Sequence, residues 1–307
     1  MKTIECHLHS YSLHNHFIHL PEYDVFRFID HAKELGFSGV NVSANGPGYR
    51  NLGGDTQEHF AKVKSYLLAA GMACELDTSD TRVDHLGQLL HVAKAIGAGT
   101  VRVYTRYEGR IGELIKWTIA DLQALAPLAE DLAVQIVLEN HEDFTGMQIC
   151  EILDAVDSPW VKALYDYGNS QNVAEDPVHA LEAMGPHITR IHMKDHIVIK
   201  HDDKYWTQGV AIGEGTLPFA ELTRRLIDMG LTRLCFENSW GYVAPIKDQY
   251  GPLPSTPCFA AFAQAPIVAL QMTPEHAVAG ELKALQHGLR HLRRICSELG
   301  YKVLNND

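Results

Sequence analysis

The sequence predicts a single α/β domain, residues 1–307, of the (β/α)8 barrel class, also called a TIM barrel. First, short apolar runs alternate eight times with helix-length amphipathic segments, a pattern typical of parallel strands joined by right-handed crossovers. Second, several apolar runs end abruptly in polar side chains. This is typical of barrel strands, whose carboxyl ends carry the functional site. Third, 307 residues with 46% hydrophobic content suffice for one large core, since a barrel of this kind takes about 250 residues.

The strands are predicted from continuous apolar runs, because a strand in a parallel sheet is covered on both faces. An open, doubly wound sheet is the alternative architecture, and the lack of a G-x-G-x-x-G motif after the first strand disfavours it. The predicted strands are 4–8, 39–43, 72–76, 100–104, 134–139, 161–166, 188–193 and 233–237.

The helices are predicted where apolar residues recur three or four positions apart. Gly36, Gly71 and Gly97 are expected to end the first three helices, because glycine readily adopts the left-handed conformation of a helix C-terminus. The fourth helix could be interrupted near Pro127. The predicted helices are 22–35, 55–70, 84–96, 110–131, 147–156, 177–184, 219–229 and 274–299.

Two segments exceed the short connections expected in this fold: 196–216 after the seventh strand and 239–273 after the eighth. Both would emerge at the carboxyl face of the barrel, so we expect them to form the wall and lid of a site. A contact between subunits, in a dimer or tetramer, is the alternative. Trp206 and Trp240 lie on these segments. They are candidates for stacking against a sugar, with packing inside the lid as the alternative role.

The composition bears on partners and location. The formal charge of −12 argues against a nucleic-acid partner, which would require a basic surface. No apolar stretch approaches 18 residues and the first residues lack a signal-peptide pattern, so we expect a cytoplasmic protein that does not bind membranes. The six cysteines are scattered without a C-x-x-C motif, which is typical of reduced thiols.

Four predicted strands, the fifth to the eighth, end in metal-ligand types of side chain: Glu139, Asp166, His192 and Glu237. Three buried carboxylates at one barrel mouth would repel one another unless a cation neutralises them. Oxygen-rich ligation with one imidazole suits Mn²⁺, Mg²⁺ or Co²⁺ better than structural Zn²⁺. We therefore predict one divalent ion, with Mn²⁺ first and Mg²⁺, Co²⁺ or Zn²⁺ as alternatives. Salt bridges to neighbouring basic side chains are the competing interpretation.

Two further residues follow these ligands on the same strand face, because side chains alternate along a strand. His141 lies two positions after Glu139 and could shuttle protons, since imidazole titrates near neutral pH. Its alternative role is to support a ligand. Lys194 stands in the same relation to His192 and could bind a substrate carboxylate or balance the acidic cluster.

His7 and His9 form an H-x-H pair at the end of the first strand. This position is also occupied in metal-dependent amidohydrolases, which makes a hydrolase an alternative. Such an enzyme would need histidines at the ends of the fifth and sixth strands, where this chain has Glu139 and Asp166. We therefore interpret His7 and His9 as pocket residues that touch substrate.

A family resemblance rests on five short runs: Glu139-Asn-His141, Asp166-Tyr-Gly-Asn169, His192-Met-Lys-Asp195, Gly213-Glu-Gly215 and Phe236-Glu237. Together they resemble the xylose-isomerase-like barrels, the sugar phosphate isomerase/epimerase group that includes keto-sugar 3-epimerases, hydroxypyruvate isomerase and inosose dehydratase. The resemblance covers residues 4–237. It implies that Glu139, Asp166, His192 and Glu237 bind one divalent metal at the ends of the fifth to eighth strands.

The resemblance implies an enzyme of carbohydrate metabolism acting on a keto-sugar or oxo sugar acid through a metal-stabilised enediolate. An isomerase or epimerase, with Glu139 or Glu237 moving the proton, is the first expectation. Asn169 stands where the epimerases place a substrate-binding histidine. The pattern is also similar to a branch with a 3-oxo-isoapionate decarboxylase, so a lyase, including an inosose-type dehydratase, is the alternative. A decarboxylase would use His141 or water as the proton donor. An inactive sugar-binding barrel is a further alternative.

Overall fold

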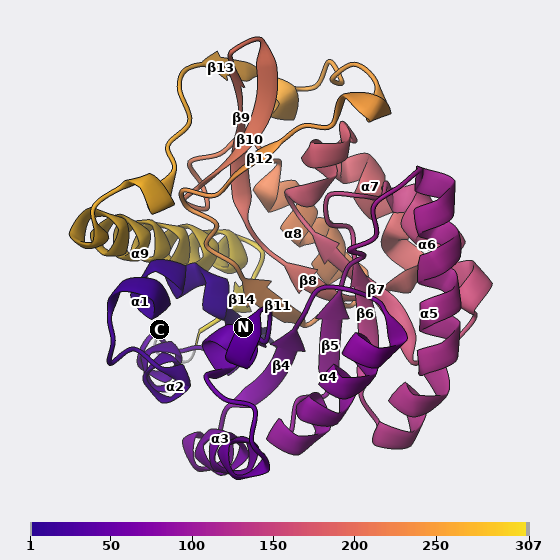
Figure 1. Cartoon of the computed structure of the whole chain (residues 1–307). Helices are drawn as coiled ribbons and strands as arrows, with labels where there is room; N and C mark the ends of the chain where they lie inside the picture. The colour runs from indigo at the N-terminus through magenta and orange to yellow at the C-terminus, as the bar shows by residue number, and fades with distance from the viewer. Residues whose placement is uncertain (1, 305–307) are drawn as a thin grey trace.

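A computed structural model of the chain describes residues 2–304 and contains the predicted barrel (Figure 1). Its eight parallel strands are hydrogen-bonded in the order β11-β2-β3-β4-β5-β6-β7-β8. Met193 closes the ring between β8 and β11: its amide donates to Cys235 O at 2.8 Å, and its carbonyl accepts from Glu237 N at 2.9 Å. The barrel strands are β2 (Glu5–His9), β3 (Gly39–Ser43), β4 (Ala73–Asp77), β5 (Thr100–Val103), β6 (Gln135–Glu139), β7 (Val161–Asp166), β8 (Ile188–His192) and β11 (Arg233–Phe236).

The helices cover the outside of the barrel (Figure 1). Gly71 and Gly97 follow α3 and α4 in the left-handed conformation, at φ 68° and 84°, as their positions predict. The fourth predicted helix continues through Pro127 as α5, so the expected interruption was wrong; Leu122, Leu125 and Ala129 are buried on either side of it. The helices are α1 (His14–His19), α2 (Val25–Glu34), α3 (Gln57–Ala70), α4 (Val83–Ile96), α5 (Ile111–Leu132), α6 (Gly146–Val156), α7 (Pro177–Met184), α8 (Phe219–Asp228) and α9 (Pro274–Glu298).

The two faces of the barrel strands differ in chemistry. Outward residues such as Leu8 and Val40 pack with the helices in the main hydrophobic core. Inward residues are largely polar: His7 contacts Glu75 at 3.2 Å, and Glu75 accepts from Arg190 at 2.8 Å. Burial of polar groups on this scale requires that they pair with one another. The interior is therefore a polar network rather than the layers of aliphatic side chains found in many barrels.

A second sheet lies over the mouth of the barrel and comes from the two long segments after β8 and β11 (Figure 1). Its strands run in the order β12-β10-β9-β13. These segments were predicted to be loops, but β9 and β10 form a hairpin, whose turn residues Asp202 and Asp203 have φ of 49° and 58°. The bounds are β9 (Asp195–His201), β10 (Lys204–Val210), β12 (Val243–Pro245) and β13 (Ala261–Ala263).

Asp195 fixes the chain that returns from this hairpin. Its carboxylate accepts from Gly213 N at 2.9 Å and Gly215 N at 3.0 Å. A Cβ at position 215 would lie 1.9 Å from Asp195 Oδ1, so only glycine fits there. The Gly213-Glu-Gly215 run is thus explained by close approach to Asp195.

The remaining elements are short. Strands β1 (Lys2–Thr3) and β14 (Tyr301–Lys302) pair beside the barrel and bring the two ends of the chain together (Figure 1). Among residues 2–304, no helix combines the length and apolar character needed to cross a membrane. The 3-10 turns are η1 (Ser10–Leu13), η2 (Pro47–Leu52), η3 (Asn169–Val173), η4 (Gly185–His187), η5 (Asp248–Tyr250), η6 (Pro257–Phe259) and η7 (Ala269–Gln271).

Candidate metal centre and substrate cavity

The four predicted ligands meet at the mouth of the barrel. Glu139, Asp166 and His192 are the last residues of β6, β7 and β8, and Glu237 directly follows β11. Parallel strands bring their carboxyl ends to one edge, and closure of the barrel gathers that edge around one point. All four side chains are buried, with exposed fractions of 7% or less.

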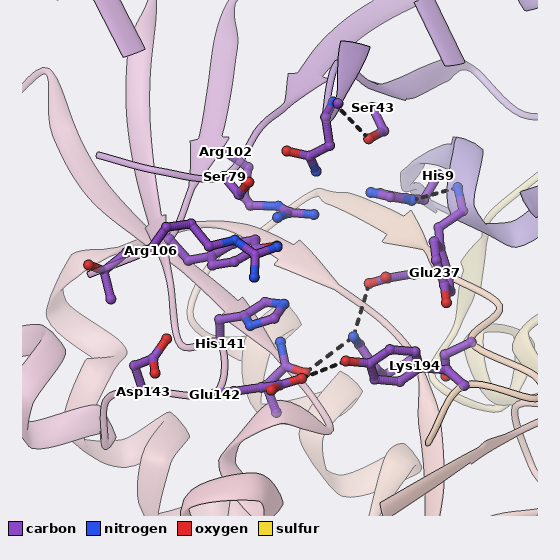
Figure 2. Close-up of a pocket in the computed structure, with 18 of the residues that line it drawn as sticks. His9, Ser43, Ser79, Arg102, Arg106, His141, Glu142, Asp143, Lys194 and Glu237 are labelled. Atoms are coloured by element: carbon purple, nitrogen blue, oxygen red, sulfur yellow. Dashed lines mark hydrogen bonds and ion pairs between the residues drawn. The ribbon is translucent and has the colours of Figure 1, made fainter. Parts of the chain in front are cut away.

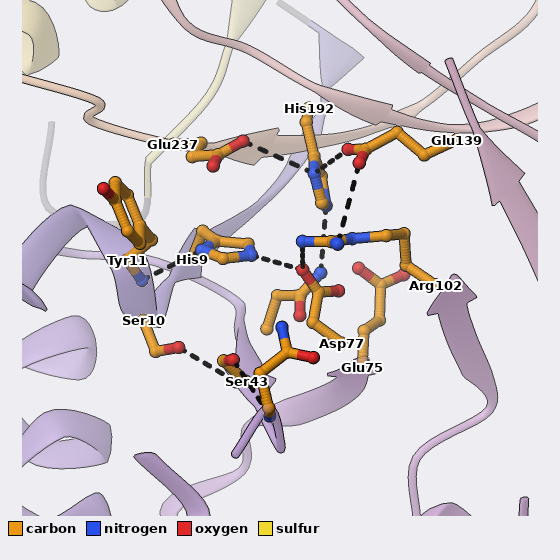
Figure 3. Close-up of polar contacts among 12 residues, drawn as sticks. His9, Ser10, Tyr11, Ser43, Glu75, Asp77, Arg102, Glu139, His192 and Glu237 are labelled. Atoms are coloured by element: carbon orange, nitrogen blue, oxygen red, sulfur yellow. Dashed lines mark hydrogen bonds and ion pairs between the residues drawn. The ribbon is translucent and has the colours of Figure 1, made fainter. Parts of the chain in front are cut away.

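The His192 imidazole lies between two of the carboxylates (Figure 3). Its Nδ1 is 3.0 Å from Glu139 Oε1 and 3.5 Å from Glu237 Oε2. Ligand atoms of Glu139, Asp166 and His192 all lie within 4.8 Å of one another, the spacing of groups that share one ion. Glu237 lies outside this mutually close set and is linked to it by its contacts with His192 and Lys194.

The Lys194 ammonium contacts two of these carboxylates, and Figure 2 shows it beside Glu237. Its Nζ is 3.1 Å from Asp166 Oδ2 and 3.3 Å from Glu237 Oε2. This contact favours the second role predicted for Lys194, the balancing of the acidic cluster. The contacts of Glu139 Oε2, Asp166 Oδ2 and Glu237 Oε2 are ion pairs with the cationic side chains of Arg102 and Lys194. Three such oxygens beside an imidazole form a donor set that fits a divalent cation.

The titration behaviour of the centre reflects its crowding. Burial raises the pKa of Asp166 to about 7; Glu237 and Glu139 add to this, and Lys194 opposes it. Burial by itself would lower the pKa of His192, but the charges of Asp77, Glu139 and Glu237 raise it to about 9. A bound cation would replace these protons, because metal ligands act in their deprotonated forms.

A supporting layer beneath the centre contains His9, which was predicted as a site residue, and Asp77 and Arg102, which were not (Figure 3). Asp77 pairs with His9 at 2.5 Å and with the Arg102 guanidinium, which also lies 3.6 Å from Glu139. His9, Asp77 and His192 form a second group with ligand-like spacing. Because Asp77 Oδ2 is already shared by an imidazole and a guanidinium, this second group is less suited to an ion.

Asn41 completes the support of His192. Its side-chain amide lies 3.1 Å from His192 Nε2, and its Oδ1 has no partner. With the amide turned so that Oδ1 faces the ring, Nε2–H donates to it and Nδ1 is left for a metal. The inward spacing Glu75-x-Asp77 on β4 and the presence of Arg102 within β5 were the sequence signals for this layer.

A cavity of about 650 Å³ opens above the centre (Figure 2). Four of the predicted site residues line it besides Glu237: His9, Asn169, Lys194 and His141. The segment after β11 contributes Ser239, Tyr242 and Lys247 to the wall. Cavities of this size hold small ligands.

His141 is held in the cavity by an aromatic neighbour. Its ring stacks on Tyr104 with centroids 3.7 Å apart and planes 7° apart, and its Nε2 lies 4.0 Å from Glu139 Oε2. Burial lowers the pKa of His141, so its neutral form prevails at neutral pH. A neutral imidazole beside the centre can accept a proton.

Three predicted substrate residues lie elsewhere. His7 is fully buried below the centre against Glu75 and does not line the cavity. His7 precedes His9 by two residues on the same face of β2, so its side chain lies one layer deeper in the barrel. Trp206 and Trp240 line a second, adjacent cavity rather than the one above the centre. Trp206 lies on β10 of the second sheet, and Trp240 packs against Gly280 of α9.

The sequence of the chain matches a family profile over residues 29–250, which is most of the barrel. The chain belongs to the xylose isomerase-like TIM barrel family. This agrees with the resemblance carried by the strand-end motifs.

Several proteins of known sequence or structure are similar to this chain at low identity. The uncharacterised protein YihM of Escherichia coli K12 is 25% identical over 248 residues, covering 79% of this chain and 76% of YihM. The 3-oxo-isoapionate decarboxylase of Pectobacterium atrosepticum is 24% identical, covering 52% of this chain and 59% of that protein. The crystal structure of an IolI protein with a bound zinc atom has the same fold, at a TM-score of 0.62 and 14% identity, covering 94% of this chain and 99% of that one.

Proposed function

We propose that this family member is a divalent-metal-dependent enzyme that isomerises or epimerises a keto-sugar or oxo sugar acid. The observation that carries the proposal is the pair Glu139 and Glu237 on either side of His192 Nδ1, at 3.0 and 3.5 Å. Epimerisation and isomerisation require a proton to leave one carbon and return from another direction or to another carbon. Two carboxylates that flank one binding point suit both transfers.

The residues that would hold the ion are Glu139, Asp166, His192 and Glu237. A bound divalent cation would polarise the substrate carbonyl and so make the neighbouring C–H more acidic. Manganese is the first expectation, because three of the four donors are carboxylates; the related fold of the IolI protein holds zinc.

The remaining roles belong to side chains of the cavity. Glu139 or Glu237 would take the proton beside the carbonyl, and the other would return it. His141 would exchange protons with solvent through its partly exposed ring, which stacks on Tyr104. Lys194 would favour the ionised forms of Asp166 and Glu237 between turnovers, since its ammonium contacts both.

A lyase is the second candidate, and sequence similarity to the 3-oxo-isoapionate decarboxylase favours it. In that reaction the substrate would lose CO₂ from a 3-oxo acid, and His141 or water would protonate the resulting carbanion. The two candidates share the ion and the cavity. They differ in the bond that breaks.

The test combines metal binding with turnover. The protein is stripped with chelator, reloaded with Mn²⁺, and assayed on a panel of keto-sugars and 3-oxo sugar acids. Glu139→Gln and Asp166→Asn are expected to weaken Mn²⁺ binding, measured by calorimetry, and to abolish turnover. Glu151→Gln, an exposed substitution on α6, serves as the matched control. Full turnover by the stripped protein would refute the metal requirement.

The product distinguishes the two candidates. Deuterium from solvent in recovered substrate indicates an isomerase or epimerase, because proton abstraction is reversible. Release of CO₂ indicates the decarboxylase.

A further inference from the structure

The carboxylates that line the cavity above the metal centre are largely occupied by partners. Four acidic side chains line this cavity, together with five of lysine or arginine. Three of the four carboxylates have a partner: Glu142 accepts from Tyr242 at 2.6 Å, Asp143 from Lys247 at 2.8 Å, and Glu237 lies 3.3 Å from Lys194. The fourth, Glu108, is exposed. The cationic groups that remain without a partner therefore decide which charged ligand the cavity suits.

Two of the five basic side chains, Arg50 and Arg106, form no ion pair within residues 2–304. Arg102, Lys194 and Lys247 are each held by at least one carboxylate. Lys194, which was predicted to bind a substrate carboxylate or to balance the acidic cluster, is thus already engaged. Both free arginines are exposed, where an unpaired cation is common. Their place in the cavity wall is what makes them candidates for an anionic ligand.

Arg106 is fixed in its position by Tyr104, whereas Arg50 has no such support. Arg106 Nη2 donates to the Tyr104 phenol oxygen at 2.7 Å, and its guanidinium carbon lies 4.8 Å from the centre of that ring. The remaining N–H groups of the guanidinium stay available. No hydrogen bond holds the Arg50 guanidinium in the described part of the chain. A group that is already ordered loses less freedom when a ligand binds, which favours Arg106.

The Tyr104 ring brings Arg106 close to the metal centre. The His141 imidazole stacks on this ring at 3.7 Å, and the Arg102 guanidinium carbon lies 5.2 Å from its centre. Figure 2 shows Arg106 beside Arg102 and His141 in the cavity wall. Because His141 Nε2 is 4.0 Å from Glu139, one small molecule can reach both the metal ligands and Arg106.

We infer that Arg106 is a specificity-determining residue, which binds a carboxylate that the substrate keeps throughout the reaction. A guanidinium matches the two oxygens of a carboxylate in a bidentate pair, and one fixed, unpaired cation matches one negative charge. The substrate class is then a keto-sugar acid whose carboxylate lies apart from the carbonyl at the metal centre. This inference rests on the proposed function only for that carbonyl.

An ion pair at Arg106 also bears on which bond breaks. Loss of CO₂ moves negative charge out of the carboxylate, so a guanidinium that holds the carboxylate stabilises the substrate more than the transition state and slows the reaction. Isomerisation and epimerisation leave the carboxylate charged throughout, so the same contact supports the substrate and the transition state alike. Recognition by Arg106 therefore favours a reaction that retains the carboxylate over a decarboxylation.

Calorimetry with unreactive ligands tests the recognition without turnover. D-Gluconate and D-glucitol differ at one end of the molecule, where a carboxylate replaces a CH₂OH group, and neither has a keto group to react. The Mn²⁺-loaded protein is expected to bind gluconate about 10-fold or more tightly than glucitol, a difference of about 1.4 kcal/mol. The preference should shrink as salt is added, because Arg106 is exposed. Phosphorylated glucitol is expected to bind no more tightly than gluconate.

Substitutions at four charged sites locate the recognition. Arg106→Gln is expected to reduce the gluconate preference to about 2-fold or less, with Mn²⁺ affinity unchanged, because the charge-assisted pair is lost. Arg106→Lys keeps the charge without the bidentate geometry and should retain part of the preference. Arg110→Gln is the matched control, since Arg110 pairs with Glu113 at 2.9 Å on the surface outside the cavity. Arg50→Gln tests the other free arginine and should leave the preference in place.

Equal affinity for gluconate and glucitol overturns the inference. A preference that survives Arg106→Gln also overturns it, because the carboxylate would then bind the Mn²⁺ ion itself. Loss of the preference in Arg50→Gln alone, tighter binding of phosphorylated glucitol, or release of CO₂ that depends on Arg106 has the same consequence. A preference that depends on Arg106, in a protein that turns over no keto acid, keeps the recognition and refutes the proposed reaction.

Discussion

The His141 imidazole lies flat against the Tyr104 ring, with centroids 3.7 Å apart and an angle of 7° between the planes. The phenol group of Tyr104 in turn accepts from Arg106 at 2.7 Å. The stack fixes the orientation of an imidazole whose Nε2 faces Glu139 at 4.0 Å. A proton-transfer group needs such fixed geometry.

His141→Gln is expected to lower kcat by about 10²–10⁴-fold, the usual contribution of a positioned acid or base. Mn²⁺ affinity should change far less, because His141 is not a ligand. Since burial lowers the pKa of His141, its neutral form persists below pH 6.5, and the activity that depends on it should fall only at more acidic pH. Kinetics across pH 5–8 measure this. Equal losses of kcat and Mn²⁺ affinity would indicate a supporting role instead.

Asp77→Asn is expected to destabilise the protein by about 3–5 kcal/mol, because it removes the carboxylate shared by buried His9 and Arg102. Urea unfolding measures the loss. Asp80→Asn is the matched control, since Asp80 pairs with Arg82 at a partly exposed position where an ion pair contributes about 0–1 kcal/mol. Similar losses in both variants would show that the buried contacts among His9, Asp77 and Arg102 contribute no more to stability than a surface ion pair.

Lys194→Met is expected to make stability depend more strongly on the ion. Without Lys194, the carboxylates of Asp166 and Glu237 lose their ammonium partner in the metal-free protein. A metal cation then no longer competes with that ammonium for these two carboxylates. The metal-free melting temperature should fall, while the rise on adding Mn²⁺ should grow. Thermal melts with and without Mn²⁺ measure both shifts. A smaller rise than in the unaltered protein would contradict a cation at these carboxylates.

Glu175→Gln is expected to remove a pH dependence of stability. Glu175 accepts from Gly146 N at 2.8 Å, and burial raises its pKa to about 7. A carboxyl group whose pKa is raised by folding binds its proton more tightly in the folded state, so stability declines as pH rises from about 4.5 through 7.

Above pH 7 the glutamine variant should therefore exceed the original protein by on the order of 1 kcal/mol, reduced from the full shift because the group is partly exposed. Urea midpoints at pH 5 and pH 8 measure the difference. Parallel pH profiles for the two proteins would show that Glu175 titrates normally.

The barrel could be predicted because its signals are local. Most strands carry apolar residues on their outward face and each helix is amphipathic, so the spacing of apolar residues along the chain indicates the type and order of the elements. The metal prediction also rested on a local signal, namely the polar residues at the strand ends. Alternation of side chains along a strand places Glu139 and His141 on one face. The second sheet was missed although Asp202-Asp203 is a recognisable hairpin turn between alternating residues. The long segment that supplies β12 and β13 gave no comparable periodic signal.

The sequence by itself determined the barrel, the family and which side chains stand at the ends of the barrel strands, because these depend on periodicity along the chain. Only the tertiary structure decided that Asp77 and Arg102 support the centre, that His7 lies beneath it, and that two indoles wall a separate cavity. Those relationships join residues up to 266 positions apart, as between Asn15 and Glu281, and depend on how closely the packed elements approach in space. No local pattern encodes such distances.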